Sequence, residues 1–164
     1  MQLESEKRMQ LTIGEWLKKY VNKTLTPEDE TSMSYPPGIG KTLGFELVEI
    51  GEATATMAMK TDPAIHGNPM GTVHGGVLCD IADAAIGSAH VTTLAEGESF
   101  TSIDLRINFF RPLWKDEIRA TAKAIQLGKT VSFYTCEITR ADGKLVAVVS
   151  SSVMTLRGDK AKGR

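Results

Sequence analysis

The hydrophobic positions follow a helical repeat near the N-terminus and a strand-like alternation after about residue 50. Between residues 13 and 21 apolar side chains recur at positions i, i+3, i+4, i+7 and i+8, which predicts an amphipathic helix. We expect its apolar face to pack on a sheet or over the mouth of a pocket. The charged face carries Lys18, Lys19 and Lys23, too few cations for strong binding to an anionic membrane surface. The prolines and glycines between residues 27 and 40 predict a loop.

Apolar and polar residues alternate in three later segments, and each of these predicts a strand with one buried face. The three segments are 53–60, 102–109 and 118–124. Two further strands, 131–140 and 145–156, are joined by Asp142-Gly143, a strong hairpin signal. Short turns between successive strands predict an antiparallel meander.

One segment, residues 74–95, interrupts the strands and predicts a long helix. Alanine, glycine and serine spread around every face of this helix, so we expect it to be buried and closely approached by its neighbours. Gly97 is a suitable C-terminal stop. A buried helix beside an antiparallel meander predicts an α+β domain whose sheet wraps around the helix.

Composition narrows the class of protein without naming a function. The 164 residues fit one domain, and 41% hydrophobic residues, 24% charged residues and a net charge of -1 are typical of a globular protein. The lack of a basic excess argues against nucleic acid as a partner. The sequence has no apolar run of membrane-spanning length, no signal-peptide pattern and only two cysteines. We therefore expect a cytoplasmic protein without stable membrane association.

Two carboxylates in the predicted helix are the first candidates for chemistry. Asp80 and Asp83 lie three residues apart, near one face. Because burying a bare charge is costly, each must be paired, hydrogen-bonded or functional. At the start of the helix, Gly75 and Gly76 would present free N–H groups, a ready site for a developing oxyanion. A plain glycine-rich loop before a helix is the alternative.

The histidines and cysteines predict neither a metal site nor a reactive thiol. His66, His74 and His90 lack the spacing of a zinc motif and share no common face. Cys79 in the predicted helix and Cys136 in a predicted strand are expected to be inert core thiols.

Three motifs follow one another along the chain: Asn68-x-x-Gly71-x-x-His74-Gly75-Gly76, then Ala82-Asp83, then Ser102-Ile-Asp-Leu-Arg-Ile-Asn-Phe-Phe-Arg-Pro112. Their order resembles that of the hot-dog-fold acyl-CoA thioesterases, with the phenylacetic-acid-degradation thioesterases as the nearest subgroup. The resemblance covers about residues 43–156. We accordingly divide the chain into an N-terminal helix and loop extension (1–40), a hot-dog thioesterase domain (41–157) and a polar tail (158–164).

The resemblance implies hydrolysis of an acyl-CoA thioester to a free carboxylic acid and CoA, without a metal or redox cofactor. CoA itself is part of the substrate. By position, Asp83 matches the catalytic carboxylate, as nucleophile or as base on water, and Gly75 matches the N–H donor that polarises the carbonyl. Asp80 matches no catalytic position and is expected to be structural. The other matches are Asn68 and His74 beside the carbonyl and Ser102 beside the water, and the candidates for the CoA phosphates are Arg111, Lys129 and Arg140.

Helix geometry adds an expectation about assembly. His74 and Asp83 are nine residues apart, roughly 13 Å along one helix, so a single helix cannot bring both to one carbonyl carbon. Two antiparallel helices related by a two-fold axis can do so. This predicts an obligate homodimer, or a homotetramer built from it, with each site shared between chains.

Two other functions stay open, and the acyl group of the substrate is undetermined. Hot-dog proteins include hydratases and dehydratases, although Asp62-Pro63 and Asn68-Pro69 match the hydratase signature only superficially. Others are non-catalytic acyl-CoA-binding modules in lipid-responsive regulators. Those regulators normally carry a DNA-binding domain, and residues 1–40 offer one helix, too little for a helix-turn-helix.

Overall fold

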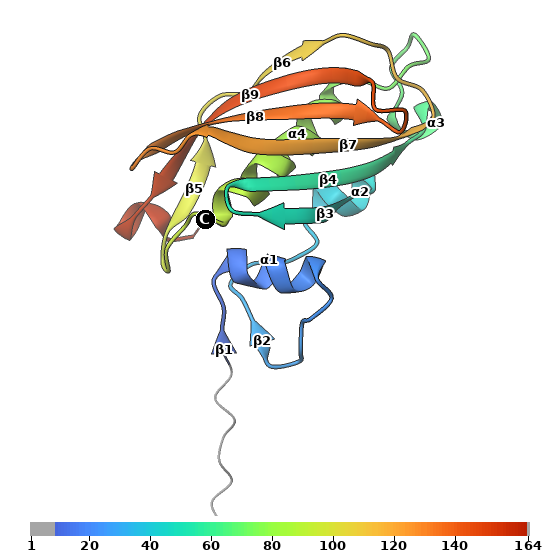
Figure 1. Ribbon diagram of the computed structural model, residues 1–164. Coiled ribbons are helices and arrows are strands. Elements are labelled where there is room, and N and C mark those ends of the chain that lie inside the picture. Colours follow the sequence, from blue (N-terminus) through green and yellow to red (C-terminus); the bar gives the residue numbers. More distant parts are fainter. Residues whose placement is uncertain (1–8, 164) are drawn as a thin grey trace, which may run out of the picture.

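The computed structural model describes residues 9–163, in which a curved seven-stranded sheet holds one long helix against its inner face (Figure 1). The helix is α4 (Gly75–Val91). All strand pairs of this sheet are antiparallel. The strands, in their order across the sheet, are β3 (Phe45–Gly51), β4 (Thr54–Thr61), β7 (Asp116–Gln126), β8 (Val131–Arg140), β9 (Leu145–Leu156) and β5 (Ser99–Ser102), and β6 (Arg106–Phe109) also pairs with β9.

The meander β7–β8–β9 confirms the predicted hairpins. β8 and β9 begin and end at the predicted residues, and Gly143 between them has a φ of 78°, a left-handed conformation that favours glycine. β4 and β7 bury the apolar members of their alternating patterns, such as Met57 and Ile118. The predicted fold class is confirmed: one antiparallel sheet wraps around a long helix.

The predicted strand over 102–109 is wrong in part, because Ser102 is the last residue of β5, residues 103–105 form a break, and only Arg106–Phe109 form the next strand, β6. Asp104 causes this break by bonding to β9 outside the ladder. Its carbonyl accepts from the Ser151 hydroxyl at 2.7 Å, and its carboxylate accepts from the Ser152 N–H at 3.0 Å. Ile103 and Phe109, expected on a buried face, are 51% and 54% exposed.

Helix α4 differs from its prediction in burial and in length. One face is fully buried under the sheet, but Asp80 and Asp83 on the other face are exposed, so the expectation of all-round burial is wrong for the single chain. The helix ends at Val91, before the predicted stop at Gly97. Two threonines after Val91 end it: their hydroxyls donate to helix carbonyls, at 2.7 and 2.8 Å. The buried residues of α4 are Leu78, Ile81, Ala82, Ala85, Ile86, Ala89, His90 and Val91.

The N-terminal helix α1 (Ile13–Val21) forms as predicted and packs beside β3 and the end of α4. A capping box between Thr12 and Glu15 begins it. Leu17 is 2% exposed and joins the main core, which confirms the expected packing on the sheet. A methyl group on Gly14 would lie 3.0 Å from the Cα of Thr92, so only glycine lets α1 approach α4 this closely.

The remaining elements are short and complete the connections. The predicted loop is wrong at its end, where α2 (Gly38–Leu43) forms a short helix with Gly40 buried against Phe45 and Gly44 in the left-handed conformation that ends it. Among residues 9–163 no helix is both long and apolar enough to cross a membrane. The other elements are the two-residue parallel pair β1 (Met9–Gln10) and β2 (Asp29–Glu30), α3 (Pro63–His66) and the 3-10 helix η1 (Gly158–Ala161).

Candidate active site

The N-terminus of α4 presents an unpaired backbone donor. His74 is the N-cap, and its Nδ1 accepts from the Gly76 N–H at 2.9 Å. The Val77 N–H donates to the His74 carbonyl at 3.1 Å. The Gly75 N–H has no acceptor within residues 9–163. It stands at the positive end of the helix dipole, where a backbone N–H stabilises an anion best.

Gly75 borders a hollow of about 420 Å³ whose walls are mainly apolar. Phe109 from β6 covers Gly75 so closely that an added Cβ would lie 2.7 Å from its Cζ atom. No larger residue therefore fits at Gly75 unless the Phe109 ring moves. The hollow is lined by Asn68, Val73, Gly75, Leu78, Phe109, Phe110, Arg111, Pro112 and Leu113.

Asn68 lies in this wall, but its amide holds its own loop. Its Oδ1 accepts from the N–H groups of Met70 and Thr72, at 2.9 and 3.3 Å, and its Nδ2 donates to the Thr72 hydroxyl at 2.9 Å. Both ends of the amide are thus engaged within residues 68–72, an Asx-type turn that shapes the approach to α4. The predicted contact of Asn68 with a substrate carbonyl stays a prediction.

Asp83 and Ser102 meet between the open face of α4 and the end of β5. The Ser102 hydroxyl donates to Asp83 Oδ1 at 2.9 Å, which holds the carboxylate in one orientation. Asp80, one turn earlier, is also exposed and makes no hydrogen bond or ion pair with the described residues. The structure therefore brings together two of the predicted site residues and leaves Asp80 outside that pair.

The oxyanion donor and the carboxylate lie on one helix but not at one point. Gly75 and Asp83 are eight residues apart, about 12 Å along the axis of α4. A nucleophile and an oxyanion donor must both come within about 3–3.5 Å of the reacting atoms. A single chain therefore holds the two halves of the predicted site apart.

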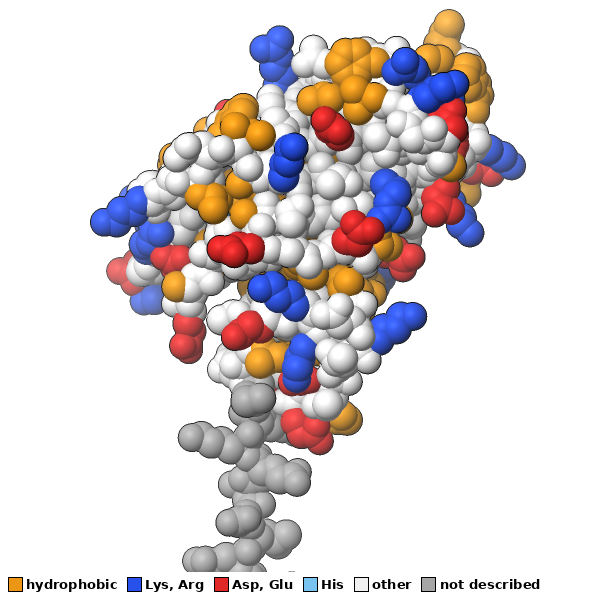
Figure 2. Space-filling view, in the orientation of Figure 1, with side chains coloured by type: hydrophobic (Ala, Val, Ile, Leu, Met, Phe, Trp, Pro, Cys, Tyr) orange, Lys and Arg blue, Asp and Glu red, His pale blue; other side chains and the backbone are white. Residues whose placement is uncertain are grey.

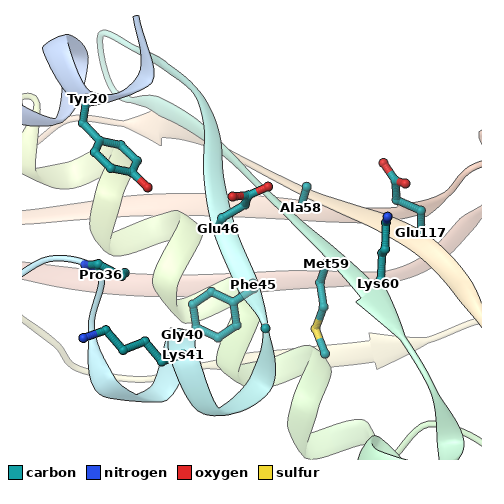
Figure 3. A pocket seen from close by; sticks show the side chains of 11 residues that line it. Tyr20, Pro36, Gly40, Lys41, Phe45, Glu46, Ala58, Met59, Lys60 and Glu117 are labelled. Atoms are coloured by element: carbon teal, nitrogen blue, oxygen red, sulfur yellow. The ribbon is translucent and has the colours of Figure 1, made fainter. Parts of the chain in front are cut away.

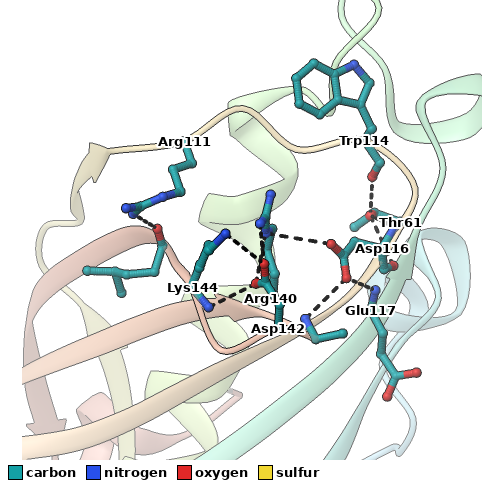
Figure 4. A network of polar contacts seen from close by, with 10 residues as sticks. Thr61, Arg111, Trp114, Asp116, Glu117, Arg140, Asp142 and Lys144 are labelled. Carbon is teal, nitrogen blue, oxygen red and sulfur yellow. Dashed lines mark hydrogen bonds and ion pairs between the residues drawn. The ribbon is translucent and has the colours of Figure 1, made fainter.

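The three basic candidates for the CoA phosphates do not form one cluster, and on the face shown in Figure 2 the lysines and arginines are interspersed with acidic side chains. Arg140 makes ion pairs with Asp116, at 3.9 Å, and with Asp142, so a phosphate would have to compete with two carboxylates (Figure 4). Arg111 donates through one Nη to the Leu145 carbonyl at 2.6 Å. Lys129 is exposed in the β7–β8 turn, eleven residues before Arg140, which is roughly 36 Å of extended chain.

The Arg140 network also changes the acidity of its partners. The Arg140 guanidinium, with help from the Lys144 backbone N–H and side chain, holds the pKa of the Asp142 carboxyl well below its usual range. Asp142 thus stays ionised and keeps Arg140 engaged at any pH near neutrality. We interpret this network as a brace for the β8–β9 hairpin.

The remaining histidines serve the fold. The buried His66 accepts at Nδ1 from the Asp62 N–H and contacts the Leu43 carbonyl through Nε2, both at 3.0 Å. His90 is 1% exposed and bonds the hydroxyls of Tyr134 and Thr155, and its burial lowers its pKa. In the described part of the chain no three His, Cys, Asp or Glu side chains are grouped to hold a metal ion.

The cysteines differ in exposure. Cys136 is fully buried, and this burial raises its pKa to about 12, as expected of an inert core thiol. Cys79 on α4 is partly exposed, and desolvation raises its pKa as well. A raised pKa keeps a thiol protonated and unreactive.

A second hollow of about 480 Å³, which the sequence did not predict, lies between α1, α2 and strands β3 and β4 (Figure 3). Its charged side chains are two lysines, Lys41 and Lys60, and two glutamates, Glu46 and Glu117. The unpaired helix N-terminus and the Asp83–Ser102 pair lie outside its walls. We therefore place the candidate active site at α4.

Comparison with known proteins shows the family of the chain. The family model of the thioesterase superfamily matches residues 70–147, which include His74, Gly75, Asp83 and Ser102. A protein of Saccharolobus solfataricus whose name describes an esterase is 31% identical over 110 residues, covering 67% of this chain and 76% of that protein. The chain belongs to the thioesterase superfamily.

Two further relatives narrow the likeness to the hot-dog acyl-CoA thioesterases. The medium/long-chain acyl-CoA thioesterase YigI of Salmonella typhimurium is 27% identical over 134 residues, covering 73% of this chain and 86% of that one. A mutant of the phenylacetic acid degradation protein PaaI of Thermus thermophilus superposes with a TM-score of 0.66 at 27% identity, covering 72% of this chain and 98% of that one. The predicted family and its hot-dog fold are confirmed.

Proposed function

We propose that this superfamily member hydrolyses acyl-CoA thioesters to a free carboxylic acid and CoA. The observation that carries the proposal is the pairing of Ser102 with Asp83 on the open face of α4, whose own N-terminus presents the unpaired Gly75 N–H. A carboxylate and an oxyanion donor are the two groups that addition to a thioester carbonyl requires. A relative named as an acyl-CoA thioesterase supports CoA as the thiol.

The chemistry divides between these groups. The Gly75 N–H would bind the carbonyl oxygen as negative charge develops on it, assisted by the helix dipole. Asp83 would either attack the carbonyl carbon or take a proton from an attacking water, and both routes need the carboxylate in the same place. The C–S bond then breaks and the departing thiolate takes up a proton. Overall, water supplies OH to the acyl carbon and H to the sulfur.

Because Gly75 and Asp83 are about 12 Å apart on α4, the proposal requires two copies of the chain. A second α4 running antiparallel would place its N-terminus beside the first chain's Asp83. Small residues on the open face of α4, Gly76 and Ala84, would let the two helices approach closely. Half-exposed Ile103 beside β5 would be covered by such a partner. We therefore assign an obligate homodimer with two shared sites.

The test combines two inactive variants. Asp83→Ala removes the carboxylate. His74→Ala removes the N-cap side chain that accepts from the Gly76 N–H and that the family resemblance places beside the substrate carbonyl. Mixed through unfolding and refolding, they form about half mixed dimers, each with one intact site of two, so about a quarter of wild-type thiol release should return.

Tagged subunits and mass spectrometry show whether mixed dimers formed. If mixed dimers form but the mixture shows no more activity than the sum of the two variants' residual activities, the hypothesis of a site shared between chains is wrong. If the wild-type protein binds hexanoyl-CoA and phenylacetyl-CoA but releases no thiol from either, the chain is a binding module and hydrolysis is wrong.

A further inference from the structure

The hollow beside Gly75 has a chemical character that bears on the substrate. Its walls are mainly aliphatic and aromatic, and they include Val73, Leu78, Phe109 and Leu113. It contains no carboxylate, and its one charged residue, Arg111, is tied by one Nη to the Leu145 carbonyl. A group attached to a carbonyl whose oxygen lies at the Gly75 N–H would therefore meet mainly hydrocarbon.

The polar groups of the wall offer little to a polar ligand. The Asn68 amide is engaged at both ends within its own loop. The pantetheine arm of CoA carries amides that lose free energy when buried without partners, whereas a hydrocarbon gains free energy on burial. The acyl group suits this hollow better than the CoA arm does.

Phe109 is the residue best placed to choose among acyl groups. Its ring touches Gly75: a Cβ built there would lie 2.7 and 3.0 Å from two of the ring's carbon atoms. In the single chain the side chain is nonetheless 54% exposed, so much of the ring makes no contact within the chain. β6 holds Phe109 opposite Ala147 of β9, within the sheet.

We propose that Phe109 determines the acyl specificity of the site, as the aromatic wall of a subsite for uncharged, apolar acyl groups next to Gly75. This inference rests on the proposed thioester hydrolysis, in which the Gly75 N–H fixes the carbonyl oxygen. An aromatic acyl group gains most from the ring, because stacked or edge-to-face aromatic pairs interact beyond simple burial. A terminal carboxylate on the acyl group would be desolvated among mainly apolar walls, where the Arg111 guanidinium, already bonded through one Nη to the Leu145 carbonyl, is the one group of opposite charge.

The experiment compares kcat/KM for phenylacetyl-, hexanoyl-, butanoyl- and succinyl-CoA in the full-length protein, measured by thiol release. In the wild-type protein succinyl-CoA should be slower than butanoyl-CoA by on the order of tenfold, because Arg111 offsets only part of the cost of desolvating the carboxylate. Phe109→Leu should lower the ratio of phenylacetyl- to hexanoyl-CoA about tenfold. Phe133→Leu, at an exposed phenylalanine of β8 away from the hollow, is the matched control and should leave this ratio unchanged.

A second variant probes the contact itself. Gly75→Ala keeps the backbone N–H but pushes the Phe109 ring aside, so it should shift the ratio in the same direction as Phe109→Leu. When Phe109 is first replaced by alanine, Gly75→Ala should change the ratio of kcat/KM for phenylacetyl- and hexanoyl-CoA less than twofold, because no ring remains to be displaced. Circular dichroism and thermal unfolding confirm that each variant folds.

Two failures are distinguishable. A wild-type protein that hydrolyses these thioesters, with a ratio that Phe109→Leu leaves within twofold, would overturn the role of Phe109 alone. Equal rates on succinyl- and butanoyl-CoA would overturn the apolar subsite. A wild-type protein that hydrolyses none of the four would overturn the proposed function together with this inference.

Discussion

The two faces of α4 differ as much as any two regions of the molecule. The inner face carries Ile81, Ala82 and Ile86, which are fully shielded by the sheet. The outer face carries Asp80 and Asp83 among small residues and is open in the single chain. One helix thus supplies both the centre of the core and the carboxylate of the candidate site.

The difference shows how a hot-dog domain can combine stability with chemistry. Burial on the inner face fixes the helix, and with it the positions of Asp83 and of the N-terminal amide of Gly75. The outer face contributes little packing within the chain, so its residues are free to meet substrate or a second subunit. Substitutions on the inner face should therefore change stability, and substitutions on the outer face should change activity.

The largest expected effect is on the inner face. Ile86→Ala removes a fully buried side chain and should lower the free energy of unfolding by about 2–5 kcal/mol. Asp80→Ala on the outer face should change it by less than about 0.5 kcal/mol. Urea unfolding at one protein concentration measures both. Equal losses would mean that the two faces contribute alike.

The next largest effect is on catalysis and comes from a substitution on the outer face of α4. Asp83→Asn keeps the shape of the side chain but removes its charge, and should lower kcat by a factor on the order of 10², about 2.7 kcal/mol of activation free energy. Asp80→Asn, one turn away, is the matched control and should keep near wild-type activity. Thiol release with the best substrate measures both. If Asp80→Asn is the inactive variant, the roles of the two carboxylates are exchanged.

The smallest expected effect is the pH dependence that the inner face adds through His90. Burial lowers the pKa of His90, with a smaller opposing effect from Glu98, so the unfolded chain binds this proton more readily than the folded one. The stability that His90 contributes by being buried in its neutral form is fully present above its unfolded pKa of about 6.5. This stability is lost as the pH falls below that value. Urea unfolding should show stability falling between pH 7 and pH 5. His90→Gln should make the free energy of unfolding less dependent on pH in this range. If the pH dependence is unchanged in this variant, other groups cause it.

Local patterns predicted most of the framework, because the interactions that form it are local. The helix at Ile13–Val21 has its capping box at Thr12 and Glu15, within one turn of its start. The β8–β9 hairpin needs only the left-handed glycine at Gly143 and two alternating strands. The predictions failed where distant groups intervene. Asp104 breaks a regular alternation through bonds to Ser151 and Ser152, nearly fifty residues away.

The candidate site was predictable only in part for the same reason. Motif order pointed to Gly75, Asp83 and Ser102, and the structure places Ser102 against Asp83 across nineteen residues of chain. The motifs could not reveal that the Asn68 amide is engaged by its own loop, since that depends on the path of the loop. The partners of Arg140 and the ring of Phe109 over Gly75 were likewise hidden, because each contact joins separate strands or a strand and a helix.

The sequence by itself determined the fold class, the meander and the family, because periodicity, turn residues and motif order are properties of the chain read in one dimension. Tertiary structure decided which face of α4 is buried, since small apolar residues occur on both faces and only the curvature of the sheet selects one. It also decided the surroundings of Gly75. The N–H of that glycine is set by helix geometry, but the aromatic wall beside it comes from β6, thirty-four residues further along the chain.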